Sequence, residues 1–560
     1  GVCLMFRNYV KIALRNLGRN KVSSFINIFG LSIAIGVSIV VYLYVHSNVT
    51  KNASHENGAS IFLVEPLADR NGNSETWGYS PNPLGPALKA DFPQVERAVR
   101  IQYGGGRVRY ENVALDDGIC FADPGFFAMF TFPLKYGNPD ALSDPDAVFM
   151  SEASAVKYFG EENPIGRRIT ITRNEQVESF TVQGVAETFP ANAAFNFSLL
   201  MNFDNQLMLG AERLDDWADF ARATFIQVKN PADIETIAAG MDRYRSLSID
   251  ANGEWAIVGY TLDNLFNLVY NARNVSGMIS GGIPWVPVII LSSIAGFLLL
   301  LSCFNYMNIS LATASGRLKE IGMRKVMGST KHQLVSQFLA ENILLCLLSL
   351  LLGVATANLF LIPAFNGITD SNLALVFSNN GTLFFFLIAL LIGIGFASGA
   401  YPAFYISSFQ PVSILRGKQK SGGRKRFMHA LLTFQFVLAF ITMIASMAFI
   451  FNNRHIGGLG WGYNYQDTIY LRLQDNSQYT VLRSAALQLP DVLNVSGSSH
   501  HVGVKSSRES AEVNGEPIST AYFDVDRNYL EMVGIRLKTG QFIEDTGAIV
   551  INDTFVRESG

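Results

Sequence analysis

The stretch that decides the fold is Phe25–Val45, FINIFGLSIAIGVSIVVYLYV, which is apolar almost throughout and contains no charged side chain. Four further charge-free runs of the same kind follow: Val286–Met307, Ile343–Phe360, Leu383–Phe404 and Leu431–Phe451. Each has the roughly 17–25 residues that a helix needs to cross the hydrocarbon core of a bilayer. Because lipid offers no partners to backbone polar groups, such segments are helical. We therefore predict a membrane protein with an α-helical transmembrane bundle of five helices.

Composition indicates a membrane protein with several domains. The chain has 560 residues, 49% of them hydrophobic and only 16% charged, against about a quarter charged in soluble domains. The first apolar run lacks a small-residue cleavage site, so we expect it to remain as an anchor. A net charge of −3 excludes a polyanion binder, and no nucleic-acid partner is expected. The scattered cysteines are predicted to be free thiols, neither a disulfide framework nor a metal cluster: Cys3, Cys120, Cys303 and Cys346.

Lysine and arginine alternate between the two sides of the predicted helices. The basic flanks are Arg7, Lys11, Arg15, Arg19 and Lys21 before helix 1, Arg317, Lys319, Arg324, Lys325 and Lys331 after helix 2, and Arg416, Lys418, Lys420, Arg424, Lys425 and Arg426 after helix 4. The loop Pro363–Thr382, between helices 3 and 4, has neither residue type. Since positive loops stay inside, we predict a multi-pass protein of the cell inner (plasma) membrane with a cytoplasmic N-terminus and both long polar segments outside.

The chain then divides into parts along this topology. They are a cytoplasmic amphipathic N-terminal segment (1–24), helix 1 (25–45), an extracytoplasmic domain (46–282), a transmembrane domain with helices 2–4 (283–405), a basic cytoplasmic linker (406–430), helix 5 (431–451) and a second extracytoplasmic domain (452–560). The domain 46–282 is predicted to be α+β. It has strand-like alternation at Arg168–Thr172 and Ser179–Val185, a helix-like stretch at Ile234–Ser246, and a turn signal at Asn230-Pro231. Gly104-Gly105-Gly106 is predicted to be a flexible turn.

An internal repeat links the two outside segments. Asp123–Met129 (DPGFFAM) and Leu134–Gly137 (LKYG) correspond to Asp526–Met532 (DRNYLEM) and Leu537–Gly540 (LKTG) at identical spacing. A strand-then-acid motif follows each block, AVFMSE ending at Glu152 and AIVIND ending at Asp553. Duplication explains five identities in register better than chance does. It leads us to expect that the second outside domain is truncated at its C-terminus, and Met5 is a plausible initiator.

The most informative polar stretch lies between helices 2 and 3, at residues 314–342. Arg317, Glu320 and Arg324 fall on one helical face, and Leu318 and Ile321 on another. We predict a short amphipathic helix along the inner membrane surface, over about 314–328, that Gly328 ends. A basic loop that merely fixes topology also explains the composition. Composition alone favours that simpler interpretation over a docking helix for a cytoplasmic partner.

Three motifs resemble the FtsX/MacB family of ABC transporter permeases. They are KEIGMRKVMG (319–328), YPAFYISSFQP (401–411) followed by Leu415-Arg416-Gly417, and the N-terminal stretch 6–36. The domain 46–282 resembles MacB-like periplasmic core domains, and 283–405 the FtsX-like transmembrane domain. The layout is similar to the longer permeases of the family that contain two such modules.

The resemblance implies a docking site for a separate ATPase. In the family the loop between the second and third helices packs into a cleft of that ATPase. The expected contact residues here are Arg317, Glu320, Ile321, Gly322, Met323, Arg324, Lys325 and Gly328. Charges at the rim would orient the two proteins, and Ile321 and Met323 would be apolar anchors.

Catalytic chemistry is not expected in this chain. A phosphate-binding loop needs Gly-x-x-x-x-Gly-Lys-Ser/Thr, and no such spacing occurs. ATP would thus be bound by the partner subunit, and we predict no cofactor, no catalytic residue and no metal ligands. His500-His501 lacks a third ligand nearby. Asn305, Asn308, Glu341 and Asn342 lie near the ends of the helices and are expected either to bond helix to helix or to snorkel to the interface. Gly353, Gly393, Gly395 and Gly399 are expected to allow close packing.

Three functions fit the sequence. The first is the permease subunit of an ABC transporter that transmits ATP-driven motion to an outside domain and exports or extracts a lipophilic or peptide-like substrate. The second is an FtsX-like regulator of extracytoplasmic cell-wall hydrolases that transports nothing. The third is a membrane sensor or adhesin without an ATPase. The resemblance further implies contact with membrane lipid, a homodimer or a pseudo-dimer formed by the repeat, and room for a periplasmic adaptor or outer-membrane partner.

Overall fold

The computed structural model describes residues 15, 18, 21–70, 73–189, 192–247, 256–369, 371–377, 381–407, 422–471, 473, 477–502, 507–513, 516–542 and 548–558. Most of the predicted N-terminal segment 1–24 and of the linker 406–430 lies outside these residues. The chain forms two compact units. One comprises Gly1–Thr170 and Ser179–Ala445, and the other Ile171–Glu178 and Ser446–Gly560.

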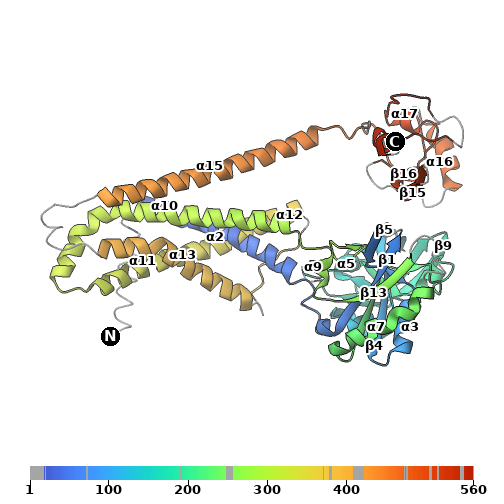
Figure 1. Ribbon diagram of the computed structural model, residues 1–560, viewed down its shortest axis with the longest axis horizontal. Helices are drawn as coiled ribbons and strands as arrows, with labels where there is room; N and C mark the ends of the chain where they lie inside the picture. Colours follow the sequence, from blue (N-terminus) through green and yellow to red (C-terminus); the bar gives the residue numbers. More distant parts are fainter. Residues whose placement is uncertain are drawn as a thin grey trace. The chain divides into compact units, whose positions relative to one another are not determined.

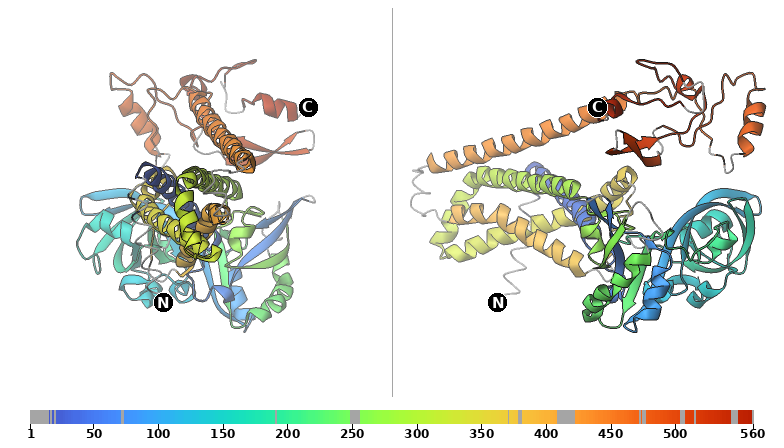
Figure 2. Two further views of the ribbon diagram at one scale, coloured as in Figure 1. Left: turned by 90° about the vertical axis from the view of Figure 1, so that its left-hand side faces the viewer. Right: turned by 45° about the vertical axis from the view of Figure 1, so that its right-hand side comes forward.

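Among the described residues, five helices are long and apolar enough to cross a membrane, as predicted. They are α2 (Lys21–Val49), α10 (Trp285–Val326), α11 (Lys331–Thr356), α13 (Gly381–Ser407) and α15 (Gly422–Gly458). Helix α11 continues through a π-helical turn, Ala357–Leu361, into α12 (Ile362–Thr369). Helices α2, α10, α11 and α13 pack side by side (Figures 1 and 2). Their core includes Leu31, Ile35, Ile39, Cys346 and Leu350.

Polar groups inside this bundle bond helix to helix, as expected for Asn308 and Asn342. The Asn342 Nδ2 donates to the Gly395 carbonyl at 2.6 Å and to Ser398 Oγ at 2.9 Å, which ties α11 to α13. The Asn308 Nδ2 donates to Gln435 Oε1 at 3.3 Å and so joins α10 to α15. Each of these asparagines is buried.

Three of the four predicted packing glycines lie against a neighbouring helix. A Cβ at Gly353 would lie 2.8 Å from Ile35 Cγ2, one at Gly395 3.3 Å from Ile343 Cγ1, and one at Gly399 2.3 Å from Asn342 Nδ2. The expectation for Gly393 is wrong, because a Cβ there would meet nothing within 4 Å. The spacing of Gly393 from Gly399 places it on a different face of α13.

The α+β domain between α2 and α10 is built on a mixed sheet of twelve strands. Its strands are β1 (Ile61–Arg70), β2 (Asn73–Trp77), β4 (Val95–Tyr110), β5 (Val113–Ala122), β6 (Leu134–Gly137), β7 (Ala147–Ser151), β8 (Arg168–Arg173), β9 (Gln176–Ala186), β10 (Leu199–Asn202), β12 (Ala223–Val228), β13 (Ala256–Asn264) and β14 (Val275–Ser276). The main path runs β14-β2-β1-β12-β4-β5-β10-β7-β9-β6, with β13 paired to β1 and β8 paired to β4 and β9. Strands β3 (Ser80–Pro81) and β11 (Phe220–Ala221) form a separate small pair.

Short helices cover this sheet (Figure 1). They are α3 (Leu84–Asp91), α4 (Phe126–Met129), α5 (Glu152–Phe159), α6 (Asn205–Met208), α7 (Ile234–Gly240) and α9 (Leu268–Asn271), with single 3-10 turns at Gly58–Ser60, Pro139–Ser143, Pro231–Asp233 and Met241–Tyr244. Strand β1 alternates between two cores because successive side chains point to opposite faces. Ile61 and Leu63 join an aromatic-rich cluster, and Phe62 and Val64 pack with α3 and α7 on the other side.

The strand predictions for this domain are confirmed, and two other local predictions are corrected. Residues 168–172 and 179–185 lie in β8 and β9. The helix predicted over Ile234–Ser246 begins as stated, but α7 ends at Gly240 and a 3-10 turn follows. The glycines at 104–106 are not a turn. They lie inside β4, where Gly105 pairs with Gly118 of β5.

The second unit repeats local structure of the first. It contains α16 (Ser477–Ala486), β15 (Ser507–Val513), β16 (Glu516–Tyr522), α17 (Tyr529–Met532) and α18 (Asp553–Glu558). The four-residue helices α4 and α17 occupy the same position in the two copies of the sequence repeat. The Asp123 carboxylate accepts from the Arg100 backbone N–H at 2.7 Å, and the Asp526 carboxylate from the Gly497 N–H at 2.9 Å.

The two copies also share a turn glycine and an ion pair. Gly137 and Gly540 both have left-handed backbones, with φ values of 101° and 92°. Lys135 Nζ lies 2.5 Å from Glu152 Oε1, and Lys538 Nζ lies 2.9 Å from Asp553 Oδ2. The repeat seen in sequence thus also recurs as a short helix, a turn glycine and an ion pair. The strand predicted before Asp553 is wrong, because residues 548–552 form no strand, whereas their counterpart Ala147–Ser151 is β7.

Candidate functional site

The predicted docking segment is the C-terminal part of α10 rather than a separate short helix. Helix α10 is continuous over 42 residues, whereas its apolar span ends at Thr313. At about 1.5 Å per residue it is roughly 60 Å long, about twice the hydrocarbon thickness. Figure 1 shows its ribbon curving at this end before α11 begins. The prediction of a distinct short helix was wrong because Ala, Arg, Leu, Lys, Glu and Met all favour helix after the apolar run stops.

Gly328 ends α10, as predicted. Its φ is 98°, a left-handed conformation that glycine adopts without strain. The Ser329 N–H donates to the Arg324 carbonyl at 3.0 Å, and the Gly328 N–H to the Lys325 carbonyl at 3.1 Å. These two bonds form a Schellman motif, which satisfies carbonyls left open at the helix end. The chain therefore reverses in a defined turn and not in a loose loop.

Helix α11 begins just after this turn with a complete capping box. The Thr330 Oγ1 accepts from the Gln333 N–H at 3.3 Å, and the Gln333 side chain accepts from the Thr330 N–H at 3.0 Å. Reciprocal bonds of this kind satisfy two backbone donors at a helix start. Only four residues, 327–330, separate the end of α10 from the start of α11, and the tip they form is locally fixed.

The predicted contact residues fall into two groups. Arg317, Glu320 and Ile321 lie in α10, but their side chains are outside the described part of the structure. The remaining five are described. Gly322 is buried, Met323 is 57% exposed, and Arg324 and Lys325 are half-buried.

Arg324 makes a contact that sequence reasoning missed. Its Nη1 donates to Gln337 Oε1 at 2.9 Å, and the Gln337 Nε2 donates to Glu341 Oε1 at 3.1 Å. The second bond joins residues four apart on α11, a spacing that places two side chains on one helical face. That spacing was visible in the sequence. The first bond needs the α10–α11 turn and was not.

The tip exposes apolar side chains beside positive charge. Met323, Val326 and Met327 are 57%, 66% and 87% exposed, well past the apolar span. Lys325 stands next to them, and burial, with the positive charge of Lys331, lowers the pKa of its ammonium group. Exposed apolar side chains rimmed by charge are typical of protein-interaction surfaces. We call residues 322–331 the α10–α11 tip.

A second set of contacts joins the bundle to the α+β domain. Asn52, three residues past the end of α2, is fully buried and has a φ of 63°. Its backbone N–H donates to the Asn192 carbonyl at 2.9 Å, its Nδ2 to the Leu265 carbonyl at 3.1 Å, and its Oδ1 accepts from the Ala194 N–H at 3.1 Å. Lys51 Nζ donates to the Gly281 carbonyl at 3.1 Å, just before α10. We call these contacts the junction.

The described histidines and cysteines can be compared with the predictions made for these residue types. Nowhere in that part of the chain do three His, Cys, Asp or Glu side chains come together to hold a metal. Cys120, Cys303 and Cys346 are free and buried there, as predicted. His501 instead lies among aromatic rings, with its Nδ1 2.9 Å from Tyr529 Oη.

Comparison with known proteins identifies both halves of the first unit. Residues 24–244 match the model of the MacB-like periplasmic core domain, and residues 292–411 match the model of the FtsX-like permease C-terminal domain. Together the two models cover most of the chain, in the order that the motifs predicted. The chain belongs to the FtsX/MacB family of ABC transporter permeases.

Curated relatives of this permease have low sequence identity to it, but the matches cover most of the chain. The pyoverdine export ATP-binding/permease protein PvdT of Pseudomonas fluorescens is 25% identical over 72% of this chain and 59% of its own length. The uncharacterized ABC transporter permease YknZ of Bacillus subtilis is 24% identical over 73% of this chain and 98% of its own length. The crystallised periplasmic region of MacB from Actinobacillus actinomycetemcomitans aligns with 39% of the permease and 95% of that chain, at 11% identity and a TM-score of 0.28. The permease thus spans about three fifths of the PvdT length.

Proposed function

We propose that this permease is the membrane subunit of an ABC exporter, driven by a separate soluble ATPase that docks on the α10–α11 tip. The ATPase supplies ATP binding and hydrolysis. The permease converts the resulting movement of the tip into movement of its α+β domain, which we place outside the membrane with the N-terminus inside. The substrate we propose is a lipophilic or peptide-like molecule handled on the outer side.

The observation that supports docking is the construction of the tip. Three exposed apolar side chains, Met323, Val326 and Met327, lie at the end of α10, where a Schellman motif ends this helix and a capping box begins the next one. A preorganised surface binds with less loss of conformational entropy than a mobile loop. Lys325 and Lys331 at its rim would steer it to an acidic partner surface. By family resemblance, Arg317, Glu320 and Ile321 would extend the same surface.

Continuity of α10 supports transmission. The helix runs unbroken from Trp285, beside the α+β domain, to Val326 at the tip. At its start, the Ile283 N–H donates to the Val269 carbonyl at 3.1 Å, and Val269, Ile283 and Val288 share a small core with Tyr44 and Val45 of α2. A force on the tip would therefore reach the domain through one rigid element. The junction then passes it to α2 as well.

The transmembrane helices support a substrate that does not cross as a polar solute. Each span contains a stretch of eighteen residues with at most two charged side chains. No file of charges of the kind that marks ion or solute paths is visible in the described spans. The substrate would instead be taken up and released by the outside domain. The export named in the PvdT description is consistent with that direction.

A dimeric arrangement completes the proposal. Two copies of the permease would present two tips to an ATPase pair. Alternatively, the repeat within one chain would form a pseudo-dimer. The shared geometry of Asp123 with Asp526, and of the two lysine–acid pairs, supports the second form. The outside domains would also be the surface for a periplasmic adaptor or outer-membrane partner, with lipid around the helices.

The test is purification of the full-length permease from gently solubilised native membranes, with identification of co-purifying proteins. We expect a stoichiometric P-loop ATPase with the wild type. Met327→Glu, which places a charge on the 87% exposed side chain, should reduce its recovery at least tenfold. The matched control Val156→Glu, at a 60% exposed position on the outer face of α5, should leave it unchanged. Wild-type permease without an ATPase, or full recovery with Met327→Glu, would contradict docking at the tip.

A further inference from the structure

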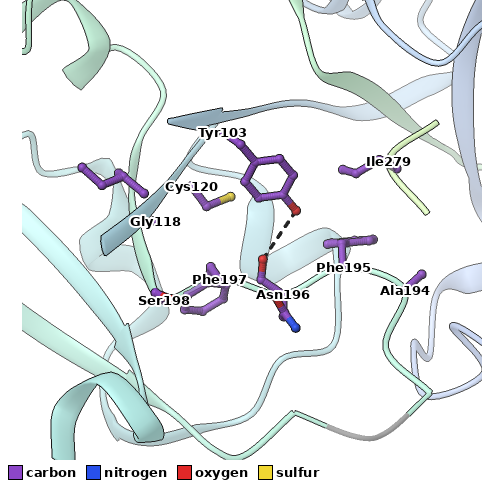
Figure 3. A pocket seen from close by; sticks show the side chains of 10 residues that line it. Tyr103, Gly118, Cys120, Ala194, Phe195, Asn196, Phe197, Ser198 and Ile279 are labelled. Atoms are coloured by element: carbon purple, nitrogen blue, oxygen red, sulfur yellow. Dashed lines mark hydrogen bonds between the residues drawn. The ribbon is translucent and has the colours of Figure 1, made fainter. Parts of the chain in front are cut away.

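A pocket of about 320 Å³ opens in the α+β domain, away from the proposed docking site. Figure 3 shows its walls. One wall comes from the β4–β5 pair and contains Tyr103, Ile119 and Cys120. The opposite wall is the extended segment 194–198, with Phe195 and Phe197, and Ile279 closes one end.

Sheet geometry explains why a space exists here. Strand β10 pairs with β5 only from Leu199 opposite Ile119 onward. Residues 194–198, which lead into β10, diverge from β5 before that point and leave Gly118 without a neighbouring side chain, since a Cβ there would meet nothing within 4 Å. The pocket is thus produced by strand divergence, and the surrounding aromatic core keeps it open. Phe195 packs on Phe130 and His55, and Phe197 on Phe189.

The lining combines apolar and polar groups in about equal measure. The rings of Tyr103, Phe195 and Phe197, with Cys120 and Ile279, are apolar, and Asn196, Ser198 and the Tyr103 hydroxyl are polar. The Tyr103 hydroxyl points across the pocket to the Asn196 carbonyl at 3.4 Å (Figure 3). That distance is at the weak end for an O–H donor, so another polar group could replace the contact at little cost. Tyr103 is 38% exposed and therefore lies at the mouth.

The pocket walls are attached to both helices that enter the domain. Ala194 donates its N–H to Asn52 Oδ1, just beyond α2. Ile279 lies two residues before Gly281, whose carbonyl accepts from Lys51 Nζ. Occupation of the pocket would press on segment 194–198 and on Ile279. It would therefore act on the ends of α2 and α10 together.

We propose that this pocket binds the apolar end of a small amphiphile, an aliphatic chain or ring of about ten non-hydrogen atoms with a hydroxyl or amide group at its polar end. The size follows from a volume of 320 Å³ at about 30 Å³ for each water-sized group. The apolar part lies between Cys120, which shares a sheet face with Tyr103, and Phe197, and the polar end takes the place of the Tyr103–Asn196 contact. Because its walls meet the junction, the ligand biases the movement of α2 relative to α10.

The experiment uses the full-length permease in lipid nanodiscs, without ATPase or ATP. The probe is a diazirine-bearing aliphatic alcohol of about ten non-hydrogen atoms, photolysed over a concentration series and mapped by peptide mass spectrometry. We expect saturable labelling of the peptides that contain residues 118–120 and 194–198, displaced by the unlabelled parent alcohol. Labelling that rises linearly with probe concentration and is not displaced would overturn the proposal, because it would show that the probe only partitions into lipid and apolar surface.

Variants separate a pocket from general apolar surface. Ala194→Trp fills the pocket and should reduce saturable labelling at least fivefold, while Val156→Trp on the exposed face of α5 should not. Tyr103→Phe retains the ring and removes the hydroxyl, so labelling by the alcohol should weaken severalfold while labelling by a hydrocarbon probe of the same shape stays equal. Equal labelling in wild type, Ala194→Trp and Tyr103→Phe would overturn the site. If Ala194→Trp melts below Val156→Trp, the Tyr103→Phe comparison decides. Docking at the α10–α11 tip is not involved in any of these readouts.

Discussion

Glu65 of β1 is a buried carboxyl group with little compensation. It is 4% exposed, its Oε1 has no hydrogen-bond partner in the described part of the structure, and its Oε2 receives only a long 3.4 Å contact from Thr261 Oγ1. Burial, and next the negative charge of Asp263, raise the pKa of Glu65 to about 7. An uncharged, protonated Glu65 therefore suits the folded α+β domain better than the carboxylate does.

This pKa predicts a domain that is more stable in mild acid. The folded state binds the Glu65 proton more tightly than the unfolded chain does, whose pKa is near the ordinary 4.5. The stabilisation is complete below about pH 4.5 and is lost as the pH rises through 7, with an upper bound of about 3 kcal/mol. Glu65→Gln should remove this loss when unfolding is measured from pH 5 to pH 8.

The contribution of His55 to stability changes with pH in the opposite direction to that of Glu65. The Glu65→Gln comparison is therefore necessary to separate the two groups. Burial lowers the pKa of the His55 imidazole to about 4, so its contribution is lost as the pH falls from 6.5 toward 4. The two slopes partly cancel in the wild type. The difference between wild type and Glu65→Gln isolates the carboxyl group. The same pH dependence in both proteins would show that Glu65 is ionised at no cost.

At the scale of elements, α11 and α13 meet through the Asn342 amide and the Gly399 backbone. The amide is 1% exposed and bonds to the Gly395 carbonyl and to Ser398 Oγ. A Cβ at Gly399 would lie 2.3 Å from the Asn342 Nδ2 and 3.1 Å from the Asn342 Cβ. Any side chain at Gly399 would therefore displace the amide and break both bonds.

Gly399→Ala and Gly393→Ala form a matched pair on α13. Gly399→Ala should lower stability by about 1–3 kcal/mol, because the clash outweighs the gain in helix propensity. Gly393→Ala faces open space and should be neutral, or more stable by up to about 1 kcal/mol. Thermal unfolding of both variants in the same detergent measures the difference. Equal melting temperatures would mean that α11 and α13 do not pack as described.

The membrane helices could be predicted from sequence, but their ends could not. Long charge-free runs decide that a segment spans lipid, and all five were identified. Helix ends depend on propensity and capping, and α10 continues past Thr313 because residues 314–326 favour helix although they are polar. Gly328 was the exception. A glycine after such a run is a local signal, and the Schellman motif needs little else.

Contacts between elements account for what the sequence did not reveal. Gly104–Gly106 has the composition of a turn, yet β5 on one side holds it as a strand. The bond from Arg324 to Gln337 depends on the angle between α10 and α11. The pocket arises where residues 194–198 leave β5, and no pattern in those residues predicts where the pairing stops. Local signals predicted the strands β8 and β9, whose alternation matches their half-buried faces.

At the scale of the whole molecule, the repeat indicates that the chain contains two copies of one structural unit. Surface ion pairs contribute little stability, typically 0–1 kcal/mol. The recurrence of Lys135–Glu152 as Lys538–Asp553 is therefore informative about architecture and not about energy. A turn glycine recurs in the same register, and so does an aspartate whose carboxylate accepts a hydrogen bond from a backbone N–H. A second copy with the same local geometry is what a pseudo-dimeric permease would need.

Asn52 is where movement of the bundle would enter the α+β domain, and its substitution tests transmission separately from docking. Asn52→Gly retains the left-handed backbone at φ 63° and removes the side-chain bonds to Leu265 and Ala194. We expect the variant to bind the partner ATPase at the wild-type level, since the α10–α11 tip is intact, but to lose at least tenfold in export or in substrate-stimulated ATP turnover. Asn52→Ala adds backbone strain, so it should lose stability by about 1 kcal/mol more than Asn52→Gly. If Asn52→Gly exports at the wild-type rate, α2 does not transmit through this contact, and α10 alone connects the tip to the domain.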